Sequence, residues 1–132
     1  MKDRDERTEE EWRETLPRER YQVLRLKGTE RPFTGTLLRN KENGVYACAG
    51  CGAELFRSDD KYDSGSGWPS FLAPISEDRV EERSDVSHGT ARTEIVCARC
   101  GGHLGHVFDD GPRPTGRRYC VNSLSLDFDK RE

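Results

Sequence analysis

The stretch Glu94-Ile95-Val96-Cys97-Ala98-Arg99-Cys100-Gly101 joins a short apolar run to two cysteines and a glycine. The stretch Val45-Tyr46-Ala47-Cys48-Ala49-Gly50-Cys51-Gly52 repeats this arrangement. In each, a strand would lead into a tight turn that brings two sulfurs onto one cation, and backbone N–H groups can point back at the thiolates. Two such turns complete a closed tetrahedral site. The sequence therefore predicts one structural zinc ion, with the ligands Cys48, Cys51, Cys97 and Cys100.

The two cysteine pairs are 45 residues apart, a longer gap than in compact zinc ribbons. The metal would therefore connect two distant parts of the chain, and folding would depend on it. The competing interpretation is a redox-active C-x-x-C pair, which would require a helix N-terminus to lower the pKa of a thiol. Neither pair is followed by a helical pattern, so we favour zinc.

Outward from these pairs, the chain after residue 31 consists of short apolar runs separated by glycine-rich turn signals. The runs at 45–47, 94–96, 118–121 and 124–128 are predicted to be strands. Turns are predicted at 43–44, 64–67, 88–89, 110–112 and 115–116. No segment of this part has sustained helical periodicity, which predicts a β-rich domain.

The N-terminal part is predicted to be different. Residues 1–7 are charged and are expected to be a disordered tail, followed by a single domain over residues 8–132. Thr8 and Glu11 have the spacing of a capping box, so a helix should begin at Thr8 and end near Leu16, before Pro17. A second helix should follow, with Tyr21, Leu24 and Leu26 on its buried face and Gly28 at its end. The helical arm thus spans residues 8–28.

Composition limits the class of protein. The chain has 132 residues, 32% hydrophobic and 36% charged, with a net charge of −3. This balance argues against a basic nucleic-acid-binding surface. No apolar run approaches the length of a membrane span, and residues 1–11 have no apolar segment typical of a signal peptide. We therefore expect a cytoplasmic protein, in which paired cysteines are more often metal ligands or catalytic groups than structural disulfides.

The fifth cysteine, Cys120, has no cysteine near it in sequence. A lone cysteine is usually a small buried apolar residue. Here Arg117 and Arg118 precede it, and a neighbouring cation favours the thiolate. Asn122 follows two residues later, on the same face of a strand as Cys120. These neighbours favour a nucleophilic role for Cys120.

Two other stretches carry unusual side chains. His103 and His106 lie three residues apart in what we read as a glycine-rich turn, and histidine is suited to proton transfer near neutral pH. They could instead form a second metal site, but the four paired cysteines already provide a full set of ligands. Trp68 lies in the loop Ser64-Gly65-Ser66-Gly67-Trp68-Pro69-Ser70-Phe71, where a pocket wall is favoured over a core position.

These motifs, in this order, resemble those of the B-type peptide methionine sulfoxide reductases, which act on the R epimer of the sulfoxide. The resemblance extends from about Glu9 to Phe128. The motifs are Cys48-x-x-Cys51, the Ser64–Phe71 loop, His88-Gly89, Arg92-Thr93-Glu94, Cys97-x-x-Cys100-Gly101, His103-Leu104-Gly105-His106-Val107-Phe108, Asp110-Gly111-Pro112 and Arg118-Tyr119-Cys120-Val121-Asn122-Ser123.

The resemblance implies two antiparallel β-sheets, with the zinc on the side away from the active site. It implies that Cys120 attacks the sulfoxide sulfur and is left as a sulfenic acid, and that the protein repairs oxidised peptides and proteins. His103 and His106 would handle protons, Asp110 would be their acidic partner, and Arg118 would favour the thiolate. Asn122 would be a polar group of the site. The implied substrate-binding residues are Trp68, Ser66 and Phe108.

Ser66 departs from the family pattern. Many members carry a cysteine here that resolves the sulfenic acid by forming a disulfide. With serine at 66, we expect an external thiol to do so, and thioredoxin is the family's usual reductant. A cysteine of the zinc site is the alternative, at the cost of the metal. We expect a monomer.

Two other classes of function remain open at this point. One is a zinc-stabilised binding module without chemistry, which would have no need of a thiol among proton donors. The other is a nucleic-acid-binding zinc ribbon, which the acidic balance and the absence of interleaved basic and aromatic residues oppose.

Overall fold

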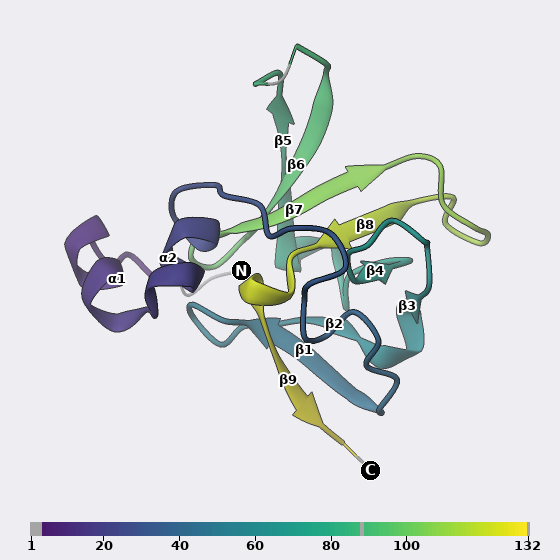
Figure 1. The fold of residues 1–132 in the computed structure, drawn as a ribbon, viewed down its shortest axis with the longest axis horizontal. Coiled ribbons are helices and arrows are strands. Elements are labelled where there is room, and N and C mark those ends of the chain that lie inside the picture. The colour runs from purple at the N-terminus through teal and green to yellow at the C-terminus, as the bar shows by residue number, and fades with distance from the viewer. Residues whose placement is uncertain (1–3, 88, 132) are drawn as a thin grey trace.

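The computed structural model describes residues 4–87 and 89–131, which form two antiparallel sheets with two short helices at one side (Figure 1). One sheet has the strand order β2-β1-β9, and the larger sheet has the order β3-β4-β8-β7-β6-β5. The predicted fold class is therefore confirmed. The elements are α1 Glu9–Thr15, α2 Arg18–Leu24, β1 Gly44–Cys48, β2 Glu54–Arg57, β3 Lys61–Tyr62, β4 Ser70–Phe71, β5 Val80–Asp85, β6 Arg92–Cys97, β7 His103–Phe108, β8 Arg118–Val121 and β9 Leu126–Lys130, with short 3₁₀ turns η1 Ser58–Asp60, η2 Glu77–Arg79 and η3 Ser123–Ser125.

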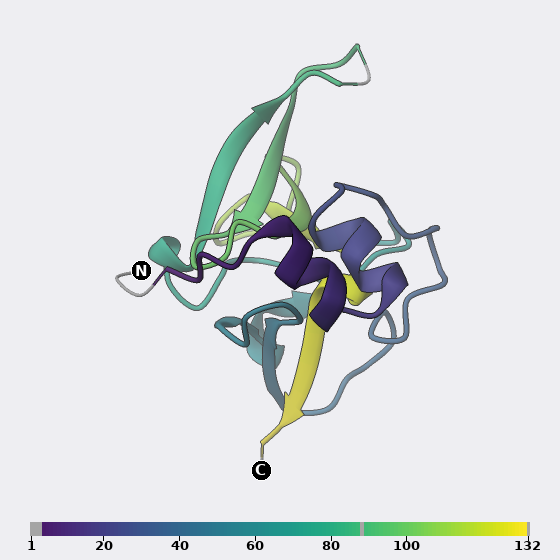
Figure 2. The same cartoon turned by 90° about the vertical axis from the view of Figure 1, so that its left-hand side faces the viewer.

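The predicted helix start at Thr8 is confirmed. The Thr8 side chain accepts a hydrogen bond from the Glu11 backbone N–H, and the Glu11 side chain accepts one from Thr8 N–H, which completes the capping box. The arm lies beside the turn between β6 and β7 (Figure 2), and it buries Trp12. The expectation for Leu26 is wrong, because α2 ends at Leu24 and the Leu26 side chain is exposed.

The predicted tail lies partly outside the described residues, which begin at residue 4. Its described part makes contacts with the folded chain. Asp5 N–H donates a 2.8 Å hydrogen bond to Arg99 O, and the Arg7 guanidinium lies 3.8 Å from the centre of the Trp12 ring. The division into a tail and one domain from residue 8 stays a prediction.

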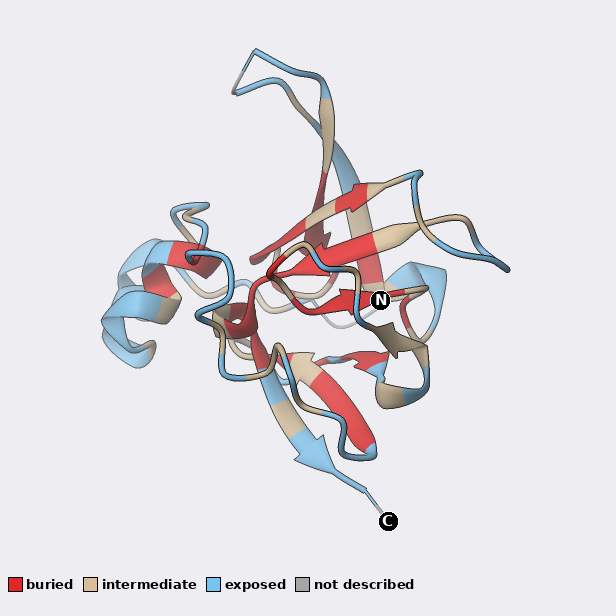
Figure 3. Cartoon of the chain, turned by 45° about the vertical axis from the view of Figure 1, so that its right-hand side comes forward, coloured by how far each residue is buried: buried red, intermediate tan, exposed pale blue. Residues whose placement is uncertain are grey.

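The core lies between the two sheets and includes a cluster of aromatic rings. The rings of Phe56 and Phe71 stack with centroids 4.4 Å apart, and Tyr46 meets Phe71 edge-on at 5.1 Å. Burying each such side chain contributes about 1.5–3 kcal/mol, so this cluster holds the sheets together despite the low apolar content. Figure 3 shows burial concentrated on the central strands and exposure at the tip of the β5–β6 hairpin.

The predicted strands correspond to β1, β6, β8 and β9, with one correction. Leu124 and Ser125 belong to the 3₁₀ turn η3, and β9 begins only at Leu126. The segment of His103 and His106 is also a strand, β7, and not a turn. Within the turn predicted at 88–89, Gly89 adopts a φ of +74°, whereas His88 lies outside the described residues.

Among the residues that the structure describes, none of the helices has the length and apolar character needed to cross a bilayer.

Candidate active site and metal centre

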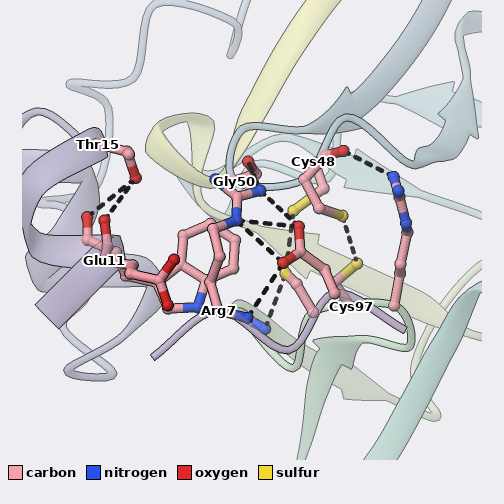
Figure 4. A network of polar contacts seen from close by, with 12 residues as sticks. Arg7, Glu11, Thr15, Cys48, Gly50 and Cys97 are labelled. Atoms are coloured by element: carbon pink, nitrogen blue, oxygen red, sulfur yellow. Dashed lines mark hydrogen bonds and ion pairs between the residues drawn. The ribbon is translucent and has the colours of Figure 1, made fainter. Parts of the chain in front are cut away.

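The four paired cysteines converge where the β1–β2 turn meets the β6–β7 turn (Figure 4). Their sulfurs all lie within 4.8 Å of one another, with Cys48 Sγ 3.7 Å from Cys100 Sγ and Cys51 Sγ 3.6 Å from Cys97 Sγ. A tetrahedral ion with metal–sulfur bonds of about 2.3 Å would separate its sulfurs by about 3.8 Å. The four cysteines therefore fit a structural metal ion.

The glycine after each cysteine pair closes its turn. Gly52 and Gly101 adopt φ angles of +81° and +76°, in the left-handed region that favours glycine. Their N–H groups donate to the carbonyls of Cys48 and Cys97, at 2.9 and 2.7 Å. In this way each turn brings both of its sulfurs to the same side.

Three arginines surround the metal centre with positive charge. Arg7 donates to Gly50 O, Arg25 to Cys100 O and Arg99 to Cys51 O, at 3.3, 2.8 and 2.9 Å. Four thiolates on a divalent cation leave a net negative charge, so these guanidinium groups would stabilise the metal-bound state.

Cys120 lies in a different place, on the central strand β8 of the larger sheet. It pairs directly with His106 of β7 on one side and with Ser70 of β4 on the other. Tyr119 and Val121 point into the core from the opposite face of β8. The alternation of side chains along β8 thus directs Cys120 and Arg118 to one face of the sheet.

A β-bulge brings the two predicted histidines together. On a regular strand, residues three positions apart point to opposite faces. The pairing of β6 with β7 changes register between Ile95 and Val96, where β7 carries one extra residue. The bulge shifts the alternation, so His103 and His106 lie on one face with ring centroids 5.6 Å apart.

Each histidine is oriented by a carboxylate that the sequence analysis did not single out. His103 Nδ1 lies 2.7 Å from Glu94 Oε2, and His106 Nε2 lies 2.7 Å from Asp85 Oδ2. The hydrogen bond from His106 holds the pKa of Asp85 well below its usual range, so Asp85 is ionised and His106 Nε2–H is the donor. Burial lowers the pKa of His103, although Glu94 opposes the shift.

Asp110 contacts Arg118, not the histidines, which corrects its expected place. Its carboxylate accepts two hydrogen bonds from Arg118, from Nε at 2.9 Å and from Nη2 at 3.0 Å. The third nitrogen, Arg118 Nη1, donates to Cys120 Sγ at 3.4 Å. The bonds from Arg118 lower the pKa of the Asp110 carboxyl, and those to Asp110 raise the pKa of the guanidinium. The predicted contact between Arg118 and the thiol is therefore present.

Ser66 occupies the space beside the Cys120 sulfur. Its Oγ lies 3.3 Å from Cys120 Sγ, and Ser70 Oγ lies 3.9 Å from the same sulfur. Ser64 links the two hydroxyls, at 2.8 Å from Ser66 Oγ and 2.7 Å from Ser70 Oγ. The loop therefore brings position 66 within contact of Cys120, with hydroxyl groups that can hydrogen-bond to a thiolate.

Trp68 and Asn122 are both fixed by the backbone of Glu30. Trp68 Nε1–H donates to Glu30 O at 3.0 Å, and Glu30 N–H donates to Asn122 Oδ1 at 3.0 Å. Asn122 Nδ2 also donates to Leu104 O at 3.0 Å. The indole and the amide are thus held in place by the loop that follows the helical arm.

Cys120, His106, Arg118, Trp68 and Asn122 take part in the lining of a pocket of about 280 Å³ that is large enough for a single side chain. His103 lies beside His106, behind this lining. The arginine Arg118 lies over the Phe108 ring, 4.3 Å from its centroid. The residues that line the pocket are Thr29, Trp68, Arg92, Gly105, His106, Phe108, Arg118, Cys120 and Asn122.

Sequence reasoning missed Glu94, Asp85 and Glu30 as parts of this site. Glu94 offered a signal, because it is a carboxylate inside a predicted strand and is buried in the structure. The sequence gives no signal for Asp85 or Glu30. The position of Asp85 beside His106 depends on how β5 pairs with β6, and Glu30 acts largely through its backbone.

Comparison with known proteins agrees with this arrangement. The SelR domain profile matches residues 16–130. A protein of Methanosarcina barkeri named peptide methionine sulfoxide reductase MsrB is 61% identical over 127 residues, 96% of this chain and 89% of its own length. Proteins with the same name from Leptospira interrogans (59% identity, 94% of this chain and 95% of the relative) and Pseudomonas savastanoi (57%, 98% and 99%) are also similar. The chain therefore belongs to the SelR domain family, that of the B-type peptide methionine sulfoxide reductases.

Proposed function

We propose that this protein is a peptide-methionine (R)-S-oxide reductase in which Cys120 is the nucleophile. The observation that carries the proposal is the position of Cys120 Sγ. It contacts the Arg118 guanidinium at 3.4 Å, pairs across the sheet with His106, and opens into a pocket with Trp68 and Phe108 in its lining. Thiolate, proton donor and apolar wall are the three groups that this reduction requires.

The chemistry follows from the poor reactivity of a sulfoxide. Its sulfur becomes electrophilic when its oxygen accepts a proton, so a thiolate and an acid must reach the same sulfoxide group. Cys120 would attack the sulfur while His106, with His103 beside it, supplies the proton. The protonated oxygen leaves the substrate sulfur as water once the Cys120–sulfur bond has formed. A water molecule then attacks the Cys120 sulfur, so this bond breaks with both electrons on the departing methionine, one proton is released, and Cys120 becomes a sulfenic acid.

Arg118 and Asp110 support the attacking thiolate. The guanidinium is fixed by two hydrogen bonds to Asp110, and its remaining nitrogen reaches the Cys120 sulfur. A cation held in this way favours the thiolate form. Asp110 would therefore act through Arg118.

An external thiol would regenerate the enzyme. Ser66 lies beside Cys120 but cannot form a disulfide, and the other four cysteines are gathered in the metal centre. A thiol would attack the Cys120 sulfenic acid and release water, and a second thiol would then reduce the mixed disulfide. We propose thioredoxin or a similar dithiol as the reductant.

The metal centre would hold one structural zinc ion. Four thiolates with no free position match a closed zinc site, and the sulfur separations match its bond lengths. Cysteines that serve as metal ligands and as a free thiol are typical of reducing compartments, so we propose a cytoplasmic enzyme. We also propose that the enzyme is a monomer.

The experiment that tests this proposal is an assay with each sulfoxide epimer separately. An N-acetylated methionine sulfoxide amide of R configuration should be reduced in the presence of dithiothreitol, and its S epimer should not. Trp68 and Phe108 account for the choice, because only one epimer can place its methyl group against the rings and its oxygen toward His106. Equal turnover of both epimers, or turnover of S alone, would contradict the proposal.

A further inference from the structure

A chain of depressions leads away from the Cys120 pocket. The outer depression, of about 790 Å³, lies between the loop 33–43 and the segment 58–67. It shares Tyr62, Asp63 and Gly65 with a middle depression that also includes Ser66. The middle depression in turn shares Arg118 with the pocket of Cys120. Each depression therefore adjoins the next through shared lining residues, and we call the three together the groove.

The outer depression is lined by three cations and one carboxylate. Arg39, Lys41 and Lys61 line it, and Asp63 is the one carboxylate among its described lining residues. Arg39 and Lys41 are exposed, and neither forms an ion pair with a described residue. Burial lowers the pKa of Lys61, while the charge of Asp63 opposes this shift and the charge of Lys41 adds to it. Like charges kept together in a concave surface attract an anionic ligand.

Phe33 adds an exposed aromatic ring to the same depression. Its side chain is 58% exposed. Its backbone φ is +67°, which is a costly conformation for an aromatic residue. The Phe33 N–H donates to Gly67 O at 2.7 Å, which attaches this loop to the loop of Trp68. A methyl group on Gly67 would lie 3.1 Å from the ring, so the ring lies directly over that glycine. Strained, exposed aromatic residues of this kind occur at binding surfaces.

We propose that this groove binds the oxidised polypeptide on one side of its methionine sulfoxide, and that its outer part selects acidic side chains there. The inference rests on the proposed function. The Cys120 pocket, of about 280 Å³, is much smaller than the outer depression of about 790 Å³, which is lined by Asn40, Asn43 and Ser58 as well as the cations. An extended peptide advances about 3.3 Å per residue, so the cations would meet side chains several positions from the sulfoxide.

The test compares oxidised peptides of equal length. Each peptide carries one methionine (R)-sulfoxide in a neutral sequence, with a pair of glutamates moved stepwise along either side, and a matching series carries lysines. For wild type, kcat/KM should rise for glutamates at a few positions on one side only and should fall for lysines there. The preference should weaken at high salt, because exposed ion pairs are screened.

Charge reversal assigns this preference to the groove. Lys41→Glu and Arg39→Glu should each lower kcat/KM for the best acidic peptide by about fivefold, within the range of an exposed ion pair. The matched control is Arg18→Glu, which makes the same change of charge on α2, outside the groove. Phe33→Asn introduces a residue that tolerates positive φ, and it should weaken the binding of every peptide regardless of the charges of that peptide.

The outcomes separate this inference from the proposed function. The N-acetylated methionine sulfoxide amide does not reach the outer depression, so its kcat/KM should be the same in wild type and in Lys41→Glu. The inference is wrong if acidic and basic peptides respond alike, or if Lys41→Glu changes only the KM of a protein reductant, which would assign the groove to that partner. Failure of wild type to reduce the small amide would contradict the proposed function, and peptide binding by fluorescence anisotropy would then test the groove by itself.

Discussion

The four-cysteine centre and the Cys120 pocket both depend on cysteine sulfur, but the neighbours of the sulfurs differ. In the centre each sulfur has other sulfurs at 3.6–3.7 Å, and the arginines nearby donate to backbone carbonyls. At Cys120 the neighbours are a guanidinium nitrogen at 3.4 Å and a hydroxyl at 3.3 Å. The first arrangement is complete once a metal binds, whereas the second leaves one side of the sulfur open to a pocket.

This difference separates the two roles of cysteine within one small domain. The metal centre joins the β1–β2 and β6–β7 turns, which belong to different sheets. Its contribution should therefore appear in stability. Cys120 lies on a strand whose other face is already packed in the core, so its contribution should appear in turnover.

The largest effect is expected when the metal is lost, and it should appear in the free energy of unfolding. Cys97→Ser, or removal of zinc by a strong chelator, should lower the free energy of unfolding by more than about 5 kcal/mol, because the site forms only in the folded chain. Thermal unfolding followed by circular dichroism, together with zinc analysis, measures this change. If the melting temperature were unchanged after the zinc had been removed, the metal centre would have no structural role.

The second effect concerns Cys120, whose replacement should lower turnover and leave stability nearly unchanged. Cys120→Ser should reduce turnover of the R sulfoxide by at least about 10³-fold, since removal of a nucleophile abolishes the covalent step. Its zinc content should not change, and its free energy of unfolding should stay within about 1 kcal/mol of wild type, because a hydroxyl fits among Ser66, Ser70 and Arg118. Retained turnover, or a loss of zinc, would remove the distinction between the two sites.

A smaller effect is expected from pH. Burial lowers the pKa of His103 in the folded state, so the unfolded chain binds its proton first as the pH falls below about 6.5. Stability should therefore decrease as the pH falls from 7.5 to 6, and His103→Gln should reduce this slope. Urea unfolding at each pH, with zinc content checked in every sample, measures the slope. An unchanged slope in His103→Gln would show that other groups cause it.

Local patterns in the sequence predicted much of the molecule. The capping box of Thr8, the two cysteine turns and the strand of Cys120 depend on neighbouring residues, and the structure confirms them. The contact of Arg118 with the Cys120 sulfur also follows from a short spacing on one strand.

The features that the sequence could not predict depend on register and on long-range contact. Histidines three residues apart suggested a turn, because only a bulge lets a strand place both on one face. The partners of His103 and His106, Glu94 and Asp85, are fixed by the pairing of β5, β6 and β7. Asp110 was assigned to the histidines from the resemblance, whereas its two hydrogen bonds to Arg118 appear only in the folded chain.

The central claim is that Cys120 reacts with the sulfoxide and has no resolving cysteine within the chain. The most direct test is mass spectrometry of the zinc-loaded enzyme after one turnover of the R sulfoxide, without reductant and with dimedone present to trap a sulfenic acid. We predict one dimedone adduct on Cys120, no disulfide and a full complement of zinc. An intramolecular disulfide between Cys120 and a cysteine of the metal centre, with release of zinc, would contradict the claim.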